Sequence, residues 1–175
     1  MNEMTSSTIG ETLRFGYGKA KIGTVLVAES DRGVAAIFLG DDRPKLRRDL
    51  AESFVAACLV EDEDGLAETI IKVVSFVDAP HLGSHLKLDL RGSDLELAVW
   101  TALRTIPSGE TRTYGAVAKT LPVAATAQEV GAACAANVLA VAIPCHRVVK
   151  ANGSISGYRW GVQRKHRLIN MEGEA

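Results

Sequence analysis

The stretch YGAVAKTLPVAATAQEVGAACAAN, residues 114–137, decides the fold of the second half of the chain. Its apolar residues recur at helical spacing on both sides of Pro122, which ends the first of two short helical segments. Thr111 and Thr113, before the first segment, each offer a hydroxyl that can cap its N-terminus. Two short helices joined by a tight turn predict a helix-turn-helix. Because most such spacings reflect packing alone, the pattern indicates a fold and leaves the function open.

Further elements surround this stretch. Ser93 or Asp94 can cap a helix that precedes it, because an acidic residue lies in the first turn and an apolar face follows. Residues 148–156, VVKANGSIS, predict a hairpin that turns at the Asn-Gly pair. Residues 161–173, GVQRKHRLINMEG, predict a final helix. The second half of the chain is therefore expected to be mainly helical.

The first ninety residues predict a separate α+β module, residues 1–90. LRFGYG, IGTVLVAES and VAAIFLG are rich in β-branched and aromatic residues, which favours a small antiparallel sheet. Pro44 begins a predicted helix that runs to about Leu59, and its apolar residues recur every four positions. Cys58 is then expected on a buried helix face. AETIIKVVSFV, residues 67–77, predicts a second helix, and LKLDL alternates like a strand.

Composition excludes several classes of protein. With 47% hydrophobic and 23% charged residues, the chain has an ordinary globular composition. No apolar run reaches the ~20 residues of a membrane helix, and the start MNEMTSS does not resemble a secretory signal. The three cysteines are scattered and odd in number, which favours reduced thiols in the cytoplasm. His81 and His85 have no cysteine near them, so neither a metal nor another cofactor is expected.

Charge is distributed unevenly along the chain. Residues 1–90 hold 10 Lys and Arg against 15 Asp and Glu, whereas residues 91–175 hold 10 against 6. The second half is the better candidate for binding an anionic partner, because clustered cations attract phosphate. The alternative is chance combined with one acidic turn, residues 61–64, and composition alone leaves both open.

The stretch IPCHRVV contains the residues with the clearest chemistry. Cysteine attacks as a thiolate, so a reactive Cys145 needs a base such as the adjacent His146. That base needs a group to orient it, and Glu172 on the final helix is the obvious carboxylate. Arg147 is interpreted as a structural ion-pair former. The alternative is a buried structural Cys-His pair, and the local residues alone do not decide between the two.

PCHRVV, with TYGAVA upstream and GYRWG downstream, resembles the O6-alkylguanine-DNA alkyltransferases. The resemblance is to the C-terminal half of the bacterial adaptive-response alkyltransferase in particular. It covers residues 91–175 tightly and the N-terminal module loosely. It implies an α+β protein with a ribonuclease H-like module, residues 1–90, and a mainly helical domain of the winged helix-turn-helix type, residues 91–175.

The resemblance also implies the role of each site residue. Cys145 would take the alkyl group from guanine O6 irreversibly, with His146 as a water-mediated base and Glu172 completing the relay. Asn137 would tie the recognition helix to the active-site turn, and Tyr114 would donate a hydrogen bond to the purine as negative charge develops. The remaining residues expected around the flipped base are Tyr158, Val148, Cys134 and Arg159.

The implied partner is double-stranded DNA that contains O6-alkylguanine, with O4-alkylthymine as a second candidate lesion. A monomer would enter the minor groove with the recognition helix and flip the base into the pocket. Gly131, Ala132 and Ala135 are small enough for a close approach to the backbone. The family's arginine on this helix is replaced by Gln128, with Glu129 next to it, so weak duplex binding is expected with the chemistry intact.

Two other functions compete with alkyl transfer. The first is a lesion-binding or regulatory DNA module with little or no transfer activity, which the replacement of arginine by Gln128 favours. The second is a cysteine hydrolase, which would need an oxyanion-binding signal that the sequence lacks. Alkyl transfer is the leading hypothesis, because a relative that does not transfer would be expected to lose Cys145.

Overall fold

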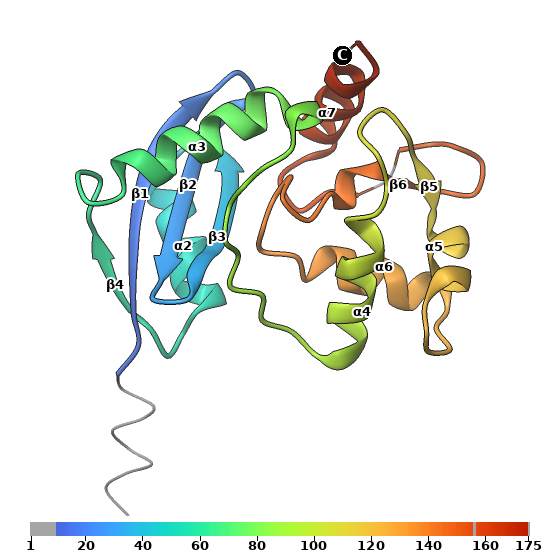
Figure 1. Ribbon diagram of the computed structural model, residues 1–175, viewed down its shortest axis with the longest axis horizontal. Helices are drawn as coiled ribbons and strands as arrows, with labels where there is room; N and C mark the ends of the chain where they lie inside the picture. Colours follow the sequence, from blue (N-terminus) through green and yellow to red (C-terminus); the bar gives the residue numbers. More distant parts are fainter. Residues whose placement is uncertain (1–9, 156, 175) are drawn as a thin grey trace, which may run out of the picture. The chain divides into compact units, whose positions relative to one another are not determined.

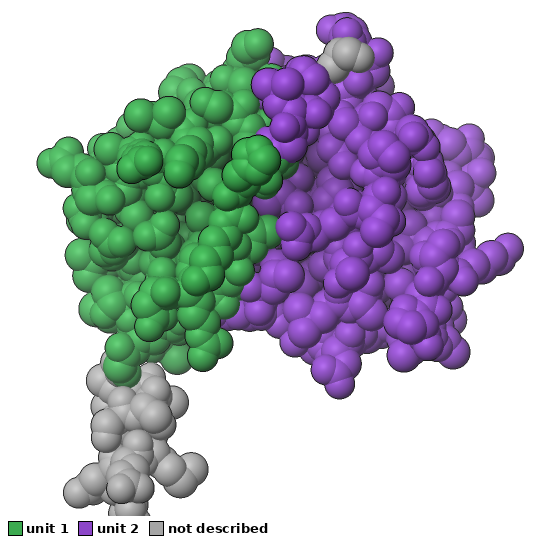
Figure 2. All heavy atoms as spheres, in the orientation of Figure 1, with its two compact units in different colours: residues 1–78, 84–89 green, residues 79–83, 90–175 purple. Residues whose placement is uncertain are grey.

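The computed structural model describes residues 10–155 and 157–174. The chain forms two compact units, coloured separately in Figure 2. The first takes in the described residues up to Asp78 together with Ser84–Asp89. The second takes in Ala79–Gly83 and the described residues from Leu90 onward. Together the units form a mixed α+β fold, as the sequence predicts.

The first unit is built on a four-stranded sheet in the order β3-β2-β1-β4 (Figure 1). Its strands are β1 (Thr12–Ala20), β2 (Gly23–Ser30), β3 (Gly33–Gly40) and β4 (Cys58–Glu61). The first three pair antiparallel, as expected, but β4 pairs parallel to β1 at the edge of the sheet. LKLDL adds a single bridge, from Leu88 to Val34, and does not form a full strand.

Two helices cover opposite faces of this sheet, α2 (Arg43–Ser53) and α3 (Ala67–Asp78). Successive residues of a strand point to opposite faces, and β1 uses this alternation. Tyr17 points toward α2, where the Arg43 guanidinium lies 4.7 Å from its ring centroid. Gly18 points toward α3, and a Cβ there would lie 2.7 Å from a methyl carbon of Val74. Glycine therefore lets α3 pack directly on the strand.

The predicted helix to Leu59 is wrong in its second half. The helix α2 ends at Ser53, and Phe54 leaves the helical region with φ −131°. Cys58 then begins β4 and is exposed, so the expectation of a buried helical thiol is also wrong. Pairing of β4 with β1 is a long-range interaction that outweighs the local four-residue recurrence, since propensity is a weak guide where tertiary contacts compete.

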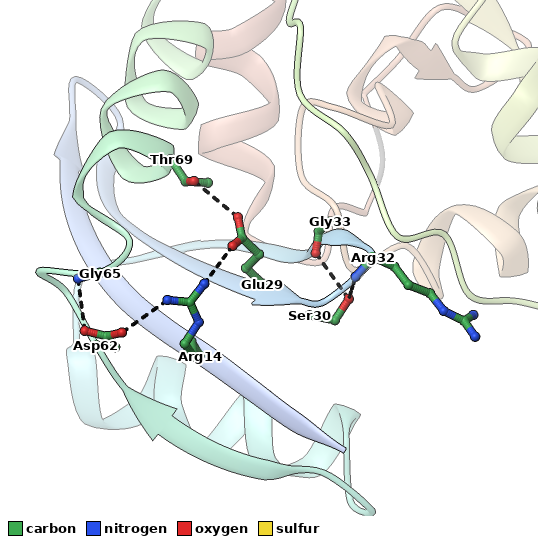
Figure 3. A network of polar contacts seen from close by, with 8 residues as sticks. All are labelled: Arg14, Glu29, Ser30, Arg32, Gly33, Asp62, Gly65 and Thr69. Carbon is green, nitrogen blue, oxygen red and sulfur yellow. Dashed lines mark hydrogen bonds and ion pairs between the residues drawn. The ribbon is translucent and has the colours of Figure 1, made fainter. Parts of the chain in front are cut away.

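Polar side chains at one end of the sheet satisfy one another (Figure 3). Arg14 donates to Glu29 and Asp62 over 3.0 and 3.2 Å, and Thr69 donates to the other oxygen of Glu29 over 3.2 Å. Ser30 donates to the buried Asp89 carboxylate over 2.6 Å. These ion pairs and hydrogen bonds give Arg14, Glu29, Asp62 and Asp89 a structural role. The sequence of this unit likewise contains no catalytic motif.

The second unit contains the two short helices predicted on either side of Pro122 (Figure 1). Its elements are η1 (Pro80–Leu82), α4 (Asp94–Leu103), β5 (Arg112–Thr113), α5 (Tyr114–Thr120), α6 (Ala127–Ala135), η2 (Cys145–Arg147), β6 (Val148–Val149) and α7 (Val162–Glu174). Ser93 and Glu96 form a capping box at α4, and the Thr113 hydroxyl caps α5. A second capping box, formed by Thr126 and Glu129, begins α6.

The hairpin predicted over residues 148–156 is present as a turn, but its first strand pairs with a different segment of the chain. A turn closes where the Gly153 amide donates to the Lys150 carbonyl over 2.8 Å. The strand β6, however, pairs parallel to β5 across a two-stranded sheet. Ser156, at the end of the expected hairpin, lies outside the described residues.

Two absences hold for the described part of the chain. None of its helices is both long and apolar enough to cross a membrane. Within residues 10–155 and 157–174, no three His, Cys, Asp or Glu side chains gather in a way that could hold a metal ion.

Candidate active site

The site begins at the C-terminal end of α6, where the buried Asn137 side chain joins three segments. Its Oδ1 accepts from the Leu139 amide over 2.8 Å. Its Nδ2 donates to the Ile143 carbonyl over 3.0 Å and to Cys145 Sγ over 3.3 Å. Asn137 therefore fixes the thiol relative to the end of α6, whose C-cap is the preceding residue, Ala136.

Trp100 holds the same helix end from α4. Its indole Nε1 donates to the Ala133 carbonyl over 2.9 Å. The Asn137 amide donates to Cys134, one residue later, over 3.2 Å, so the Ala133 carbonyl lacks its usual helical partner. The indole fills this role, and Trp100 is therefore part of the support for Asn137.

Two tight turns shape the backbone that carries Cys145. The Ala142 amide donates to the Ala140 carbonyl over 2.7 Å, and the Cys145 amide donates to the Ile143 carbonyl over 2.7 Å. The first turn is centred on Val141, which has φ 68° although its side chain is β-branched. Strain of this kind persists only where surrounding structure over-determines it, and here the Val141 side chain is buried.

Cys145 is a buried thiol, and its surroundings have opposite effects on its pKa. Burial raises its pKa, because the thiolate loses its hydration. The Asn137 hydrogen bond and the charges of Lys165 and Arg159 act in the opposite direction, although the net direction remains upward. The thiol therefore needs a base close by to become a nucleophile.

His146 and Glu172 meet at the distance expected for such a base and its orienting group. His146 Nε2 lies 3.1 Å from Glu172 Oε2, and both side chains are buried. Neither nitrogen of the ring makes a well-aligned hydrogen bond with a described residue. Burial lowers the pKa of His146, so the imidazole is neutral and able to accept a proton.

Arg147 binds the same carboxylate. Its Nε and Nη2 donate to Glu172 over 3.0 and 2.5 Å, and its Nη1 donates to the Ile106 carbonyl over 2.7 Å. Burial alone would raise the pKa of Glu172, but the adjacent His146 ring and the hydrogen bonds and charge of Arg147 lower it to about 2. The carboxylate is therefore ionised at neutral pH.

Lys165 is a site residue that the sequence prediction missed. It lies on α7, is 1% exposed, and its Nζ is 3.5 Å from the Tyr114 hydroxyl. Burial lowers its pKa, while the neighbouring thiols Cys145 and Cys134 raise it. A lysine within the basic run QRKHR resembles an ordinary exposed residue. The sequence signal for its burial was its spacing of three residues from Leu168, which places both on the same side of the helix.

The residues expected around the substrate base have different degrees of burial. Val148 and Cys134 are buried, and burial raises the pKa of Cys134 to about 12, so this thiol is inert. Tyr158 packs edge-on against Trp160, and its buried hydroxyl has no hydrogen-bond partner among the described residues. Arg159 is exposed, with its guanidinium 3.5 Å from the Asn137 carbonyl.

The outward side of α6 contrasts with this buried cluster. Gln128, Ala132 and Ala135 are exposed. Gly131 lies near the ring of Tyr114, since a Cβ added to this glycine would be 3.9 Å from two ring carbons. Glu129 is also exposed, and its carboxylate accepts from the Thr126 amide over 3.0 Å. The small residues therefore form a smooth surface without a cation.

The second unit therefore places a buried cysteine, a histidine and a carboxylate in one cluster, beside two short helices, and comparisons with known proteins identify the family. Residues 94–174 match the family model described as 6-O-methylguanine DNA methyltransferase, DNA binding domain. The Methanosarcina acetivorans methylated-DNA–protein-cysteine methyltransferase is 32% identical over 89% of this chain and 95% of its own length. The chain belongs to the methylated-DNA–protein-cysteine methyltransferase family.

Two further relatives extend this comparison. The bifunctional transcriptional activator/DNA repair enzyme Ada of Escherichia coli is 42% identical over 94% of this chain. The chain spans 47% of that protein, so it covers about half the length of this curated relative. The crystal structure of Mycobacterium tuberculosis OGT in complex with DNA has a TM-score of 0.76 at 29% identity, over 92% of this chain and 93% of that one.

Proposed function

We propose that the protein repairs DNA by direct reversal, moving the alkyl group of O6-alkylguanine irreversibly onto its own Cys145. The observation that carries the proposal is the buried cluster in which the Asn137 amide donates to Cys145 Sγ over 3.3 Å and His146 lies 3.1 Å from Glu172. A thiol, a neutral base and an ionised orienting carboxylate are the groups that nucleophilic displacement requires. Membership of the family supports the same chemistry.

In the proposed reaction His146 takes the Cys145 proton through one water molecule, while Glu172 holds the ring. The thiolate then forms a bond to the alkyl carbon as the bond from that carbon to guanine O6 breaks. The electron pair goes to the purine, where Tyr114 donates a hydrogen bond to the developing charge. The product is a thioether, from which thiolate is a poor leaving group, so each molecule acts once.

We propose that the base reaches Cys145 by flipping out of the double helix, since the reacting oxygen lies inside the stack. The helix α6 would enter the minor groove along Gly131, Ala132 and Ala135, whose small side chains permit a close approach. The flipped base would contact Tyr158, Val148, Cys134 and Arg159. O4-alkylthymine is a second candidate lesion for the same pocket.

The finer architecture belongs to the same proposal. We propose that residues 1–90 form a ribonuclease H-like module and residues 91–175 a winged helix-turn-helix domain that binds DNA. The protein would act as a monomer in the cytoplasm without a cofactor. Gln128 is expected to weaken duplex binding, because its uncharged side chain releases no counterion from the phosphates.

Intact-mass analysis after exposure to an O6-methylguanine oligonucleotide tests the proposal. We expect one added methyl group, mapped by peptide analysis to Cys145, and no adduct in Cys145→Ala. Cys134→Ala and Cys58→Ala are matched controls, one for a buried and one for an exposed thiol, and both should still be methylated. Binding of the oligonucleotide without an adduct would overturn the proposal in favour of a lesion-binding module.

A further inference from the structure

The Glu172 carboxylate contacts two basic side chains at once. Arg147 reaches both of its oxygens, with Nε 3.0 Å from Oε1 and Nη2 2.5 Å from Oε2. The His146 ring lies 3.1 Å from Oε2 through its Nε2, without hydrogen-bond alignment. The stronger, two-pronged interaction therefore belongs to Arg147, and the weaker one belongs to the candidate base.

Arg147 also balances the negative charge of Glu172. All three side chains are buried, and a buried carboxylate needs a counter-charge. The permanently charged guanidinium supplies it, so Glu172 does not need a protonated imidazole as a partner. Burial lowers the pKa of His146, and the charges of Arg147 and Lys165 lower it further, against the opposite effect of Glu172.

Arg147 also fixes where the carboxylate lies. Its Nη1 donates to the Ile106 carbonyl over 2.7 Å, beyond the end of α4, while the carboxylate comes from α7. The guanidinium is planar, so bonds at both of its ends restrict the position of Glu172 on α7. The ring of His146, next to Arg147 in η2, contacts a carboxylate that is already held in place.

We propose that Arg147 is a positioning residue for the transfer step, which holds Glu172 and neutralises its charge so that His146 stays neutral and free to take the Cys145 proton. The inference rests on the proposed function for its biological meaning, but it concerns the Cys145–His146 pair itself. The proton leaves Sγ for the imidazole, and the thiolate pair forms the new bond to carbon. Arg147 gives up no proton and touches no substrate atom.

The test is the pH dependence of Cys145 methylation by a small donor, methyl iodide, without DNA. In Arg147→Met, Glu172 faces His146 alone and favours the protonated ring, so the acid limb of the rate profile should move to higher pH. The shift has this direction whichever of the two coupled groups carries the remaining proton. A shift of one unit lowers the rate on that limb about tenfold.

Two further variants separate charge from structure. Arg147→Met combined with Glu172→Gln removes both charges, so its acid limb should return toward that of the original chain. Arg147→Lys keeps the charge but loses the fork, so its limb should stay in place while the rate falls. Thermal unfolding of each variant reports on the structural contribution separately.

A purely structural Arg147 would lower the rate equally at every pH, and an unmoved acid limb in Arg147→Met would overturn the inference. If Arg147→Met does not fold, Arg147→Lys provides the test. This variant keeps the positive charge, so an acid limb of its rate profile that moves to higher pH would overturn the inference equally. The proposed function fails differently, because its failure is the absence of an adduct from methylated DNA while the methyl iodide profile keeps its dependence on Arg147.

Discussion

The residues around Cys145 and the outward side of α6 belong to the same unit but follow different constraints. Asn137, His146 and Glu172 are at most 4% exposed. The Asn137 and Glu172 side chains are hydrogen-bonded, and His146 lies 3.1 Å from Glu172. On α6, Gln128 and Ala132 are exposed, and the helix carries no arginine or lysine. The chemistry is buried and paired, whereas the surface proposed to meet DNA lacks positive charge.

Buried and exposed positions differ in how well they tolerate substitution. A buried polar group costs free energy unless it has a partner, so the residues around Cys145 depend on one another. An exposed position away from such contacts tolerates substitution within about 0.5 kcal/mol. Glutamine at position 128 is therefore compatible with a stable fold, and its effect should appear in DNA binding alone.

The largest effect is expected for Asn137→Ala. This change leaves the Leu139 amide and the Ile143 carbonyl without the side-chain bonds of 2.8 and 3.0 Å. The Ile143 carbonyl keeps its bond from the Cys145 amide, so the Leu139 amide is the group left unpaired. A buried group left unpaired costs about 1–3 kcal/mol, so the free energy of unfolding should fall by about that amount. Urea denaturation measures it, with Gln128→Ala as the exposed control. Equal stabilities would contradict the described contrast.

A smaller effect, on reactivity, is expected for Lys165→Met. The Lys165 charge lowers the pKa of Cys145, so its removal should raise that pKa and move the pH at which the thiol reacts to higher values. A shift of one unit would lower the rate at neutral pH about tenfold.

The pH profile of Cys145 methylation by methyl iodide provides the measurement for Lys165→Met. Arg164→Met is the matched control, because this neighbouring cation donates to the Trp160 carbonyl and should leave the profile unchanged. Identical profiles for the two variants would show that the buried lysine does not act on the thiol.

The smallest effect is expected for Glu129→Gln. Glutamine keeps the capping geometry but removes the negative charge that favours the helix N-terminus, which costs about 0.3–1 kcal/mol. Duplex affinity should rise slightly, because an acidic group near phosphate is lost. Glu96→Gln makes the same change in the capping box of α4, so it should lose similar stability without a gain in affinity. An equal gain in both variants would argue against α6 as the DNA-binding helix.

The sequence predicted the local features of the fold well, because caps and turns depend on neighbouring residues. Ser93 with Glu96 and the Thr113 cap are of this kind. It failed at Cys58, where parallel pairing with β1 replaces a helix, because strand pairing across the chain leaves no local signal. It also missed Lys165, since a buried cation becomes evident only once Tyr114 and the thiols are seen around it.

We propose that this chain keeps the alkyl-transfer chemistry but lacks a DNA-binding cation on α6. The most direct test compares Cys145 methylation by an O6-methylguanine duplex and by free O6-methylguanine, in the original chain and in Gln128→Arg. In Gln128→Arg we expect the reaction with the duplex to be faster and the salt dependence of duplex affinity to be steeper by about one unit. The reaction with free O6-methylguanine should be unchanged. An unchanged duplex rate, or equal changes with both donors, would contradict it.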